Sequence, residues 1–137
     1  MTEVSQARLN VMRAFYLLLF LERGYRVVAQ LGSGESLGPF DGVAYAYWGA
    51  LALLCALGLR YPLRMVPVLL MFLLYKLLWL ALVALPLWSA GAEFDPVMLQ
   101  FTIAMAVGVA IDLLVIPWSY VIANYLRAPA ERGRAGG

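Results

Sequence analysis

Four long apolar stretches, separated by short breaks, constrain this chain more than any other feature of its sequence. They cover residues 11–31, 43–59, 63–88 and 97–125. The breaks are rich in glycine, proline and serine, which interrupt helices. A membrane-spanning helix needs about 20 residues, so four of them use nearly all of the 137 residues. The sequence therefore predicts an all-α fold, a polytopic membrane four-helix bundle formed by one domain, residues 1–126.

The composition excludes the common alternatives to a membrane protein. The chain is 64% hydrophobic and 13% charged, whereas soluble domains are about 45–50% apolar and about 25% charged. A soluble domain of this size could not bury so much apolar surface. The net charge of +2 indicates no polyanionic partner. We therefore expect a lipid bilayer as the main partner and no nucleic acid.

The charges in the breaks and at the ends of the stretches alternate in sign along the chain, and Lys and Arg collect on the cytoplasmic side of membrane proteins. Arginine marks the N-terminal segment, the second break and the tail, at Arg8, Arg13, Arg60, Arg64, Arg127, Arg132 and Arg134. The first and third breaks carry only acidic charges, at Glu35, Asp41, Glu93 and Asp95. This pattern places both termini in the cytoplasm and makes residues 127–137 a basic, flexible C-terminal tail. The Ala-, Leu-, Gly- and Arg-rich composition suggests a bacterial source, and so a multi-pass protein of the bacterial cytoplasmic (inner) membrane.

The first stretch also has two other interpretations. Its uninterrupted apolar core runs only from Ala14 to Leu21, which resembles a signal peptide. Charged residues would, however, crowd the cleavage region of such a peptide. A helix lying in the membrane interface would put the basic N-terminus on the wrong side. The alternating charges favour a spanning helix.

Five ionisable residues lie well inside the stretches and form the candidate site: Glu22, Arg23, Arg26, Lys76 and Asp112. A charged residue at the centre of a membrane helix costs about 2.5–3.5 kcal/mol on insertion scales, so such residues face one another or a wet cavity. They are the candidates for binding a ligand or a proton. The alternative is a buried network that only fixes the register of the helices.

The spacing of these charges predicts how they pair. Glu22 and Arg26 are four residues apart and can pair along one helix. Lys76 and Asp112 are the natural pair between helices, which leaves Arg23 as the remainder. Together with Gln30, the charges of the first stretch occupy an arc of about 100°. We expect this polar stripe to face the interior of the bundle.

The residues available for other chemistry are few. The chain has no histidine, and Cys55 is its only cysteine. A metal site, His-ligated haem or His-activated nucleophile is therefore not expected within one chain, and we assign no catalytic residue. Cys55 lies in an apolar segment and is expected to pack as a small hydrophobe. No cofactor is predicted, although a bound lipid or quinone is compatible with the charged site.

Prolines and small residues suggest where the helices bend and touch. Pro117 lies inside the fourth stretch, where it should kink the helix near Asp112. Small residues recur four apart in the second stretch, as at Ala46 and Ala50. This spacing lets helices approach closely. It indicates packing within the bundle or, alternatively, the interface of a homodimer.

Part of the chain resembles a known family. Leu59-Arg60-Tyr61-Pro62 is followed by Pro67, an apolar run and Lys76, and the fourth stretch carries Ala110-Ile111-Asp112-Leu113-Leu114. These segments resemble the DoxX-like family of small bacterial four-helix membrane proteins, some of which are associated with oxidoreductase complexes and quinone-linked sulfur metabolism. The Ser-His that often follows the fourth-helix motif in that family is absent here. The resemblance therefore implies the four-helix fold rather than a redox activity.

Three functions fit these observations. The first is an accessory or binding subunit that joins a membrane-protein complex. The second is a homo-oligomeric transporter or channel for protons, anions or a small amphiphile, in which several copies would supply the pathway. The third is an intramembrane enzyme acting on a lipid or quinone, with Glu22 or Asp112 as acid or base. The small size and the lack of a nucleophile–base pair favour the first.

Overall fold

The computed structural model describes residues 4–133, and every regular element in this range is helical. In chain order the elements are α1 (Gln6–Ser33), α2 (Pro39–Arg60), α3 (Val66–Trp79), η1 (Leu80–Ala84), α4 (Leu85–Ser89), α5 (Pro96–Val115), α6 (Trp118–Val121) and η2 (Ile122–Leu126). Residues 127–133 of the predicted tail have no regular secondary structure, and Arg134 lies outside the described residues. The all-α class is confirmed for this part of the chain.

Three of the long helices begin at prolines. Pro39 and Pro96 lie in the first turn of α2 and α5, and Pro67 lies in the first turn of α3. The N–H that proline lacks would have no partner within the helix at these positions, so proline fits there without loss. At the start of α5 the side chain of Asp95 also accepts a hydrogen bond of 2.8 Å from the backbone N–H of Met98. Local sequence is therefore enough to start these helices.

The third predicted stretch is one continuous helical segment, Val66–Ser89, made of α3, η1 and α4. Pro86 lies inside it without ending it. The turn before this proline, η1, is a wider π-helical turn in which the N–H of Leu85 donates to the carbonyl of Leu80. Such local widening is a usual way for a helix to absorb an interruption.

The fourth predicted stretch, residues 97–125, is not one helix. α5 ends at Val115, and Ile116 is extended, with ψ of 128°. Pro117 then separates α5 from α6 and η2. The expected kink within a continuous helix was therefore wrong. A proline disfavours the helical conformation for the residue before it, and here that effect ends the helix.

Side chains satisfy the carbonyl groups that the end of α5 leaves free. The indole N–H of Trp118 donates to the carbonyl of Leu113 at 2.8 Å. Arg8, from α1, donates to the carbonyls of Leu114 at 3.0 Å and Ile116 at 2.8 Å. Because unpaired backbone groups are costly in a membrane, these contacts make a helix end tolerable and tie α1 to α5.

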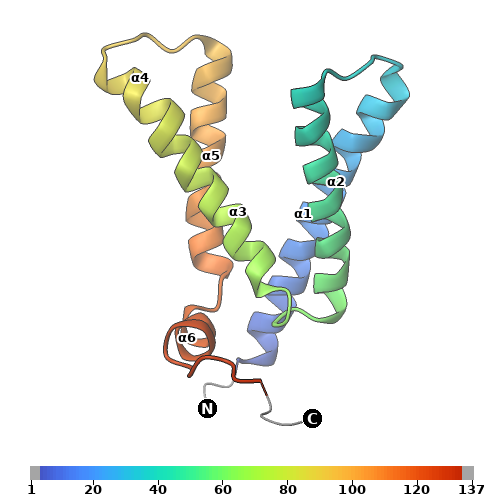
Figure 1. Cartoon of the computed structure of the whole chain (residues 1–137), viewed down its shortest axis with the longest axis vertical. Helices are drawn as coiled ribbons and strands as arrows, with labels where there is room; N and C mark the ends of the chain where they lie inside the picture. Colours follow the sequence, from blue (N-terminus) through green and yellow to red (C-terminus); the bar gives the residue numbers. More distant parts are fainter. Residues whose placement is uncertain (1–3, 134–137) are drawn as a thin grey trace.

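The long helices form two hairpins that meet at one end (Figure 1). α1 packs against α2, and α3 packs against α5. Smaller contacts join α1 to α5 and α2 to α3 where the hairpins meet. From this junction the hairpins diverge toward the loops that connect α1 to α2 and α4 to α5 (Figure 1). The expected bundle is therefore open at one end, as a V rather than a closed cylinder.

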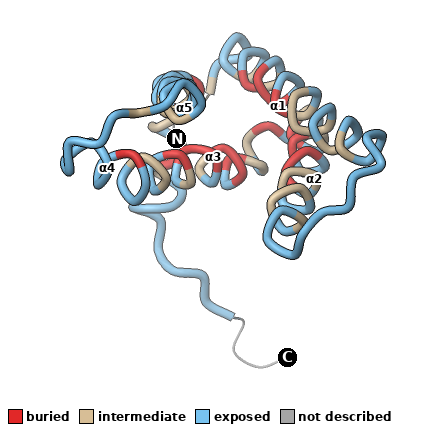
Figure 2. The backbone as a smooth tube through the Cα atoms, turned by 90° about the horizontal axis from the view of Figure 1, so that it is seen from above, coloured by how far each residue is buried: buried red, intermediate tan, exposed pale blue. Residues whose placement is uncertain are grey.

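The core lies at the junction of the hairpins. Tyr16, Cys55, Leu69, Phe72 and Ile116 are fully buried there. Figure 2 shows the buried residues concentrated on α3 and on facing parts of α1 and α2, whereas most of α5 is exposed. Cys55 packs among apolar side chains, as predicted. The exposed helix surfaces carry many large apolar side chains, as expected for helices surrounded by lipid.

Three helical segments are long and apolar enough to cross a membrane: Pro39–Arg60, Val66–Ser89 and Pro96–Val115. α1 is not one of them, because it carries five charged side chains along its 28 residues. The start of α1, α6 and the α2–α3 loop lie at the junction end, and the two acidic loops lie at the opposite end (Figure 1). The arginines near the start of α1 and at the α2–α3 loop are thus at the opposite end of the helices from the acidic loop residues.

Candidate functional site

The predicted pair between Lys76 and Asp112 is present and joins α3 to α5. The Lys76 ammonium donates to Oδ2 of Asp112 at 2.6 Å. The lysine side chain is 8% exposed and the aspartate side chain is fully buried. Lys76 also lies near two aromatic rings of its own helix, 5.4 Å from the centre of Phe72 and 5.7 Å from that of Tyr75. Charge and cation–π attraction therefore both stabilise the ammonium.

Gly108 makes room for this lysine. A Cβ atom at Gly108 would lie 3.0 Å from Cε of Lys76 and 3.2 Å from its Nζ. The lysine stem thus crosses directly over the backbone of α5 to reach Asp112 one turn further along. A glycine at this position was not recognised from the sequence, because nothing in its local pattern distinguishes it from an ordinary helix residue.

Asp112 keeps one unused hydrogen-bonding atom. Its Oδ1 is buried and has no partner in the part of the chain that the structure describes. A carboxylate can accept several hydrogen bonds, and buried polar atoms are usually paired. This oxygen could therefore accept a bond from a small donor or carry a proton.

The charges of α1 form a second group. Glu22 pairs with Arg26, as predicted, and its other oxygen lies 3.1 Å from Nε of Arg23. Arg23 also donates from Nη2 to the hydroxyl of Tyr75 at 2.7 Å. The prediction that Arg23 is the unpaired remainder was therefore wrong, because one carboxylate serves both arginines.

Burial differs sharply within this second group. The side chain of Arg23 is 13% exposed, whereas that of Arg26 is 54% exposed. The expectation that the whole polar stripe faces inward thus holds for Arg23 and fails for Arg26. Trp48 of α2 covers both guanidinium groups, 5.5 Å from Arg23 and 6.0 Å from Arg26. Gln30 is half-buried.

Aromatic residues of α3 join the two groups into one cluster. Tyr75, which accepts from Arg23, directly precedes Lys76 in the chain. The ring of Phe72 lies 5.6 Å from Arg23 on one side of the cluster and 5.4 Å from Lys76. All five predicted charges therefore belong to one charged cluster that runs from exposed Arg26 to buried Asp112. Its aromatic members were missed, since a tyrosine or phenylalanine in an apolar helix carries no distinctive signal.

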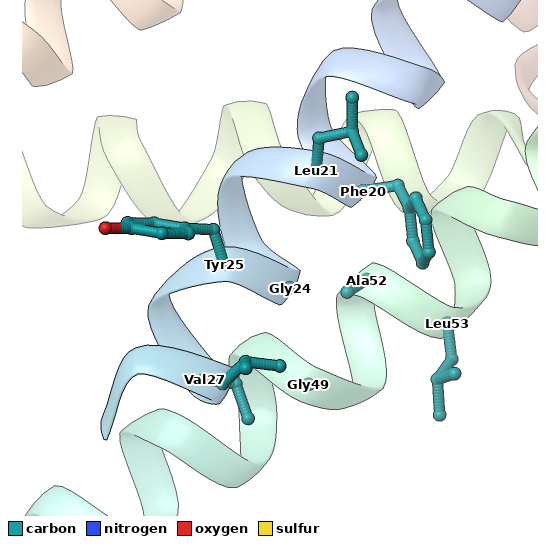
Figure 3. A pocket seen from close by; sticks show the side chains of 9 residues that line it. Phe20, Leu21, Gly24, Tyr25, Val27, Gly49, Ala52 and Leu53 are labelled. Carbon is teal, nitrogen blue, oxygen red and sulfur yellow. The ribbon is translucent and has the colours of Figure 1, made fainter. Parts of the chain in front are cut away.

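A separate apolar groove of about 450 Å³ lies between α1 and α2 (Figure 3). Gly24 on α1 and Gly49 and Ala52 on α2 form its floor, and Phe20 and Leu53 stand at its edges (Figure 3). None of the predicted site residues lines it. The small residues of α2 thus leave a surface groove on this side as well as packing against α1.

The chemistry of the cluster is that of charge and hydrogen bonding. Within the described residues, no three Cys, Asp or Glu side chains come together in a way that could hold a metal ion. No known protein family, curated protein or solved structure matches this chain. The fold and the charged cluster alone therefore provide the basis for a function.

Proposed function

We propose that this protein is a four-span protein of the bacterial cytoplasmic membrane, with both termini in the cytoplasm, that acts as an accessory subunit and binds its partner near the charged cluster. The observation that carries this proposal is the burial of the Lys76–Asp112 pair between α3 and α5, beside Tyr75, whose hydroxyl accepts from Arg23 of the other hairpin. The resemblance to DoxX-like proteins supports its four-helix form.

The geometry of α1 supports a fourth span. Its 28 residues correspond to about 42 Å of helix, more than the roughly 30 Å of a bilayer core. α1 packs against α2, which is itself long and apolar enough to span. The pairing of Glu22 with two arginines, and the contact of one of them with Tyr75, lower the cost of placing charge at this depth.

The open shape supports an accessory role. A transporter or enzyme that worked alone would enclose its site among its own helices. Here the two hairpins separate above the junction, which leaves helix surfaces available to a helix of another membrane protein. In lipid, helices associate through close packing and polar contacts rather than the hydrophobic effect. A buried charged cluster beside open helix faces suits such an association.

Labelling of single cysteines tests the topology. In a Cys55→Ala background, we would introduce one cysteine at a time in place of Gln6, Ser36, Ala92 or Ala128, all exposed in the structure. A membrane-impermeant maleimide applied to intact cells should label Ser36→Cys and Ala92→Cys only. Labelling of positions 6 and 36 from the same side would show that α1 does not span and would refute the four-span proposal.

Native mass spectrometry of the protein extracted in mild detergent tests the accessory role. We expect a complex of fixed stoichiometry with a second membrane protein. The matched variant replaces both charges, as Lys76→Met with Asp112→Leu, and should weaken this complex if the partner recognises the cluster. A monomer without any partner would contradict the proposal.

Transport is the second candidate, because a buried carboxylate with an unpartnered oxygen could carry a proton. A homodimer or larger homo-oligomer in the same spectrum would favour it, since about 130 residues are too few to enclose a pathway. An intramembrane enzyme acting on a lipid or quinone remains a third proposal, and a retained small molecule would point to it.

A further inference from the structure

Two arginines near the start of α1, Arg8 and Arg13, and two at the α2–α3 connection, Arg60 and Arg64, differ in their contacts. Arg8 donates to carbonyl groups at the end of α5, and Arg13 donates to the carbonyl of Leu59 at the end of α2. These two guanidinium groups hold helix ends together. Arg60 and Arg64, by contrast, are exposed at the two sides of the short α2–α3 connection. Within residues 4–133, no carboxylate lies within ion-pair distance of either one.

One aromatic ring holds this second pair of arginines together. The guanidinium carbon of Arg60 lies 5.3 Å from the centre of the Tyr61 ring, and that of Arg64 lies 5.4 Å from it. Cation–π attraction favours each contact and holds two like charges against the same ring. Such a pair is favourable for an anion that both can reach, and guanidinium groups match the oxygens of a phosphate.

The backbone that carries these arginines is fixed. The N–H of Tyr61 donates to Leu57 at 2.9 Å, and the N–H of Met65 donates to the carbonyl of Tyr61 at 3.1 Å. The carbonyl of Pro62 accepts from the buried hydroxyl of Tyr16 at 2.9 Å. Because these three hydrogen bonds hold the connection, its backbone loses little conformational entropy when a ligand binds.

The surroundings favour a phosphate that belongs to a lipid. The connection joins two segments that are long and apolar enough to span a membrane, so it lies at the level of the headgroups. One helical turn toward the membrane, on the same side of α2 as Tyr61, Leu57 is half exposed. A free phosphate ion would use the arginines only, whereas a lipid would also contact this apolar surface.

We propose that Arg60 and Arg64, held by Tyr61, bind the phosphate group of an anionic phospholipid. Basic residues between spanning helices on the cytoplasmic side are suited to such headgroups. The inference rests on the proposed membrane insertion and orientation but not on the accessory role. The cysteine labelling above tests the insertion separately, so failure of one can be distinguished from failure of the other.

Lipid retention by the full-length protein tests this site. The protein would be exchanged into mixed micelles with equal amounts of phosphatidylglycerol and phosphatidylcholine, and bound lipid would be counted by native mass spectrometry. The variant Arg60→Gln with Arg64→Gln should reduce the preference for phosphatidylglycerol on the order of 30-fold, because each guanidinium would lose a direct hydrogen bond to the phosphate that contributes about a factor of five. Tyr61→Leu should lose part of the preference.

The matched control is Arg127→Gln with Arg132→Gln, which removes the same amount of charge from the C-terminal segment that follows η2. It should change the preference less than about threefold, since exposed charges without a fixed geometry are screened. An equal loss in both double variants would overturn the proposal by showing a general effect of charge. Binding of inorganic phosphate without any preference for the anionic lipid would overturn the lipid assignment. Circular dichroism should show unchanged helix content in every variant.

Discussion

Removing one charge of the Lys76–Asp112 pair should destabilise the protein far more than removing both. At the observed separation of 2.6 Å, the Coulomb attraction is about 6 kcal/mol for an effective dielectric constant of about 20. Much of this offsets the cost of burying the two ions. When one partner is lost, the other stays buried without compensation, which costs about 3–5 kcal/mol in known cases. We expect Asp112→Asn to lose stability in that range.

Replacing both residues by apolar ones removes the attraction and the burial cost together. We expect Lys76→Met with Asp112→Leu to lie within about 1 kcal/mol of the unaltered protein, or to be more stable. The surroundings favour this result, because the pair lies between α3 and α5 in a largely apolar core that includes Phe72 and Leu73. The double variant also separates the contribution of the charges to binding from their contribution to folding.

Equilibrium unfolding in mixed micelles measures these free energies. Helix content is followed by circular dichroism while the mole fraction of a denaturing detergent rises. Asp41→Asn is the control, because it makes the same chemical change at an exposed position and should alter stability by less than about 0.5 kcal/mol.

Two results would refute the reasoning. If Asp112→Asn changes the free energy of unfolding by less than about 1 kcal/mol, the ammonium of Lys76 does not depend on Asp112 for its stabilisation. If the double variant loses as much stability as the single variants Lys76→Met and Asp112→Leu combined, the charges act independently rather than as a pair.

Three further predictions concern two closely packed glycines and the hydrogen bonds at the end of α5. Gly58→Ala should cost about 1–3 kcal/mol in the same unfolding measurement, because its new Cβ would lie 2.5–2.7 Å from the buried ring of Tyr16. Gly49→Ala is the control and should be neutral or stabilising, because the nearest atom to its new Cβ is 3.9 Å away. Equal effects of the two substitutions would contradict this reasoning. Gly108→Val should displace the buried ammonium from its carboxylate and lose stability, and the loss should shrink in the Lys76→Met, Asp112→Leu background. Arg8→Gln should cost about 1–3 kcal/mol and increase amide exchange at the end of α5, and unchanged exchange would show that this arginine does not hold the helix end.

Part of the charged cluster was predictable from the sequence. Lys76 and Asp112 stand in apolar stretches that are expected to lie side by side, and a membrane makes each alone costly. The ion pair between Lys76 and Asp112 could therefore be predicted from the cost of burying either charge alone. The sharing of Glu22 by two arginines did not follow, because counting charges assigns each residue one partner. It depends on the side-chain directions of Glu22, Arg23 and Arg26, which the folded structure sets.

The end of α5 shows a second limit. A proline in an apolar helix predicts a disturbance at that point, but not whether the helix bends or ends. Here the side chains of Arg8 and Trp118 donate hydrogen bonds to the free carbonyls, so the helix can end completely at this point. Arg8 is more than 100 residues away in sequence, and no local pattern connects it with this helix end.

The sequence by itself determined that this chain consists of helices apolar enough for a membrane, where most of those helices begin, and which charges would need partners. Only the tertiary structure decided that the helices form two diverging hairpins, that five charges and three aromatic rings make one cluster, and that Arg60 and Arg64 are exposed without a carboxylate partner among the described residues. The physical reason is that apolar composition sets the solvent of a helix but not its neighbours. In lipid, the neighbours are chosen by close packing and polar contacts, and these depend on the shape and direction of individual side chains.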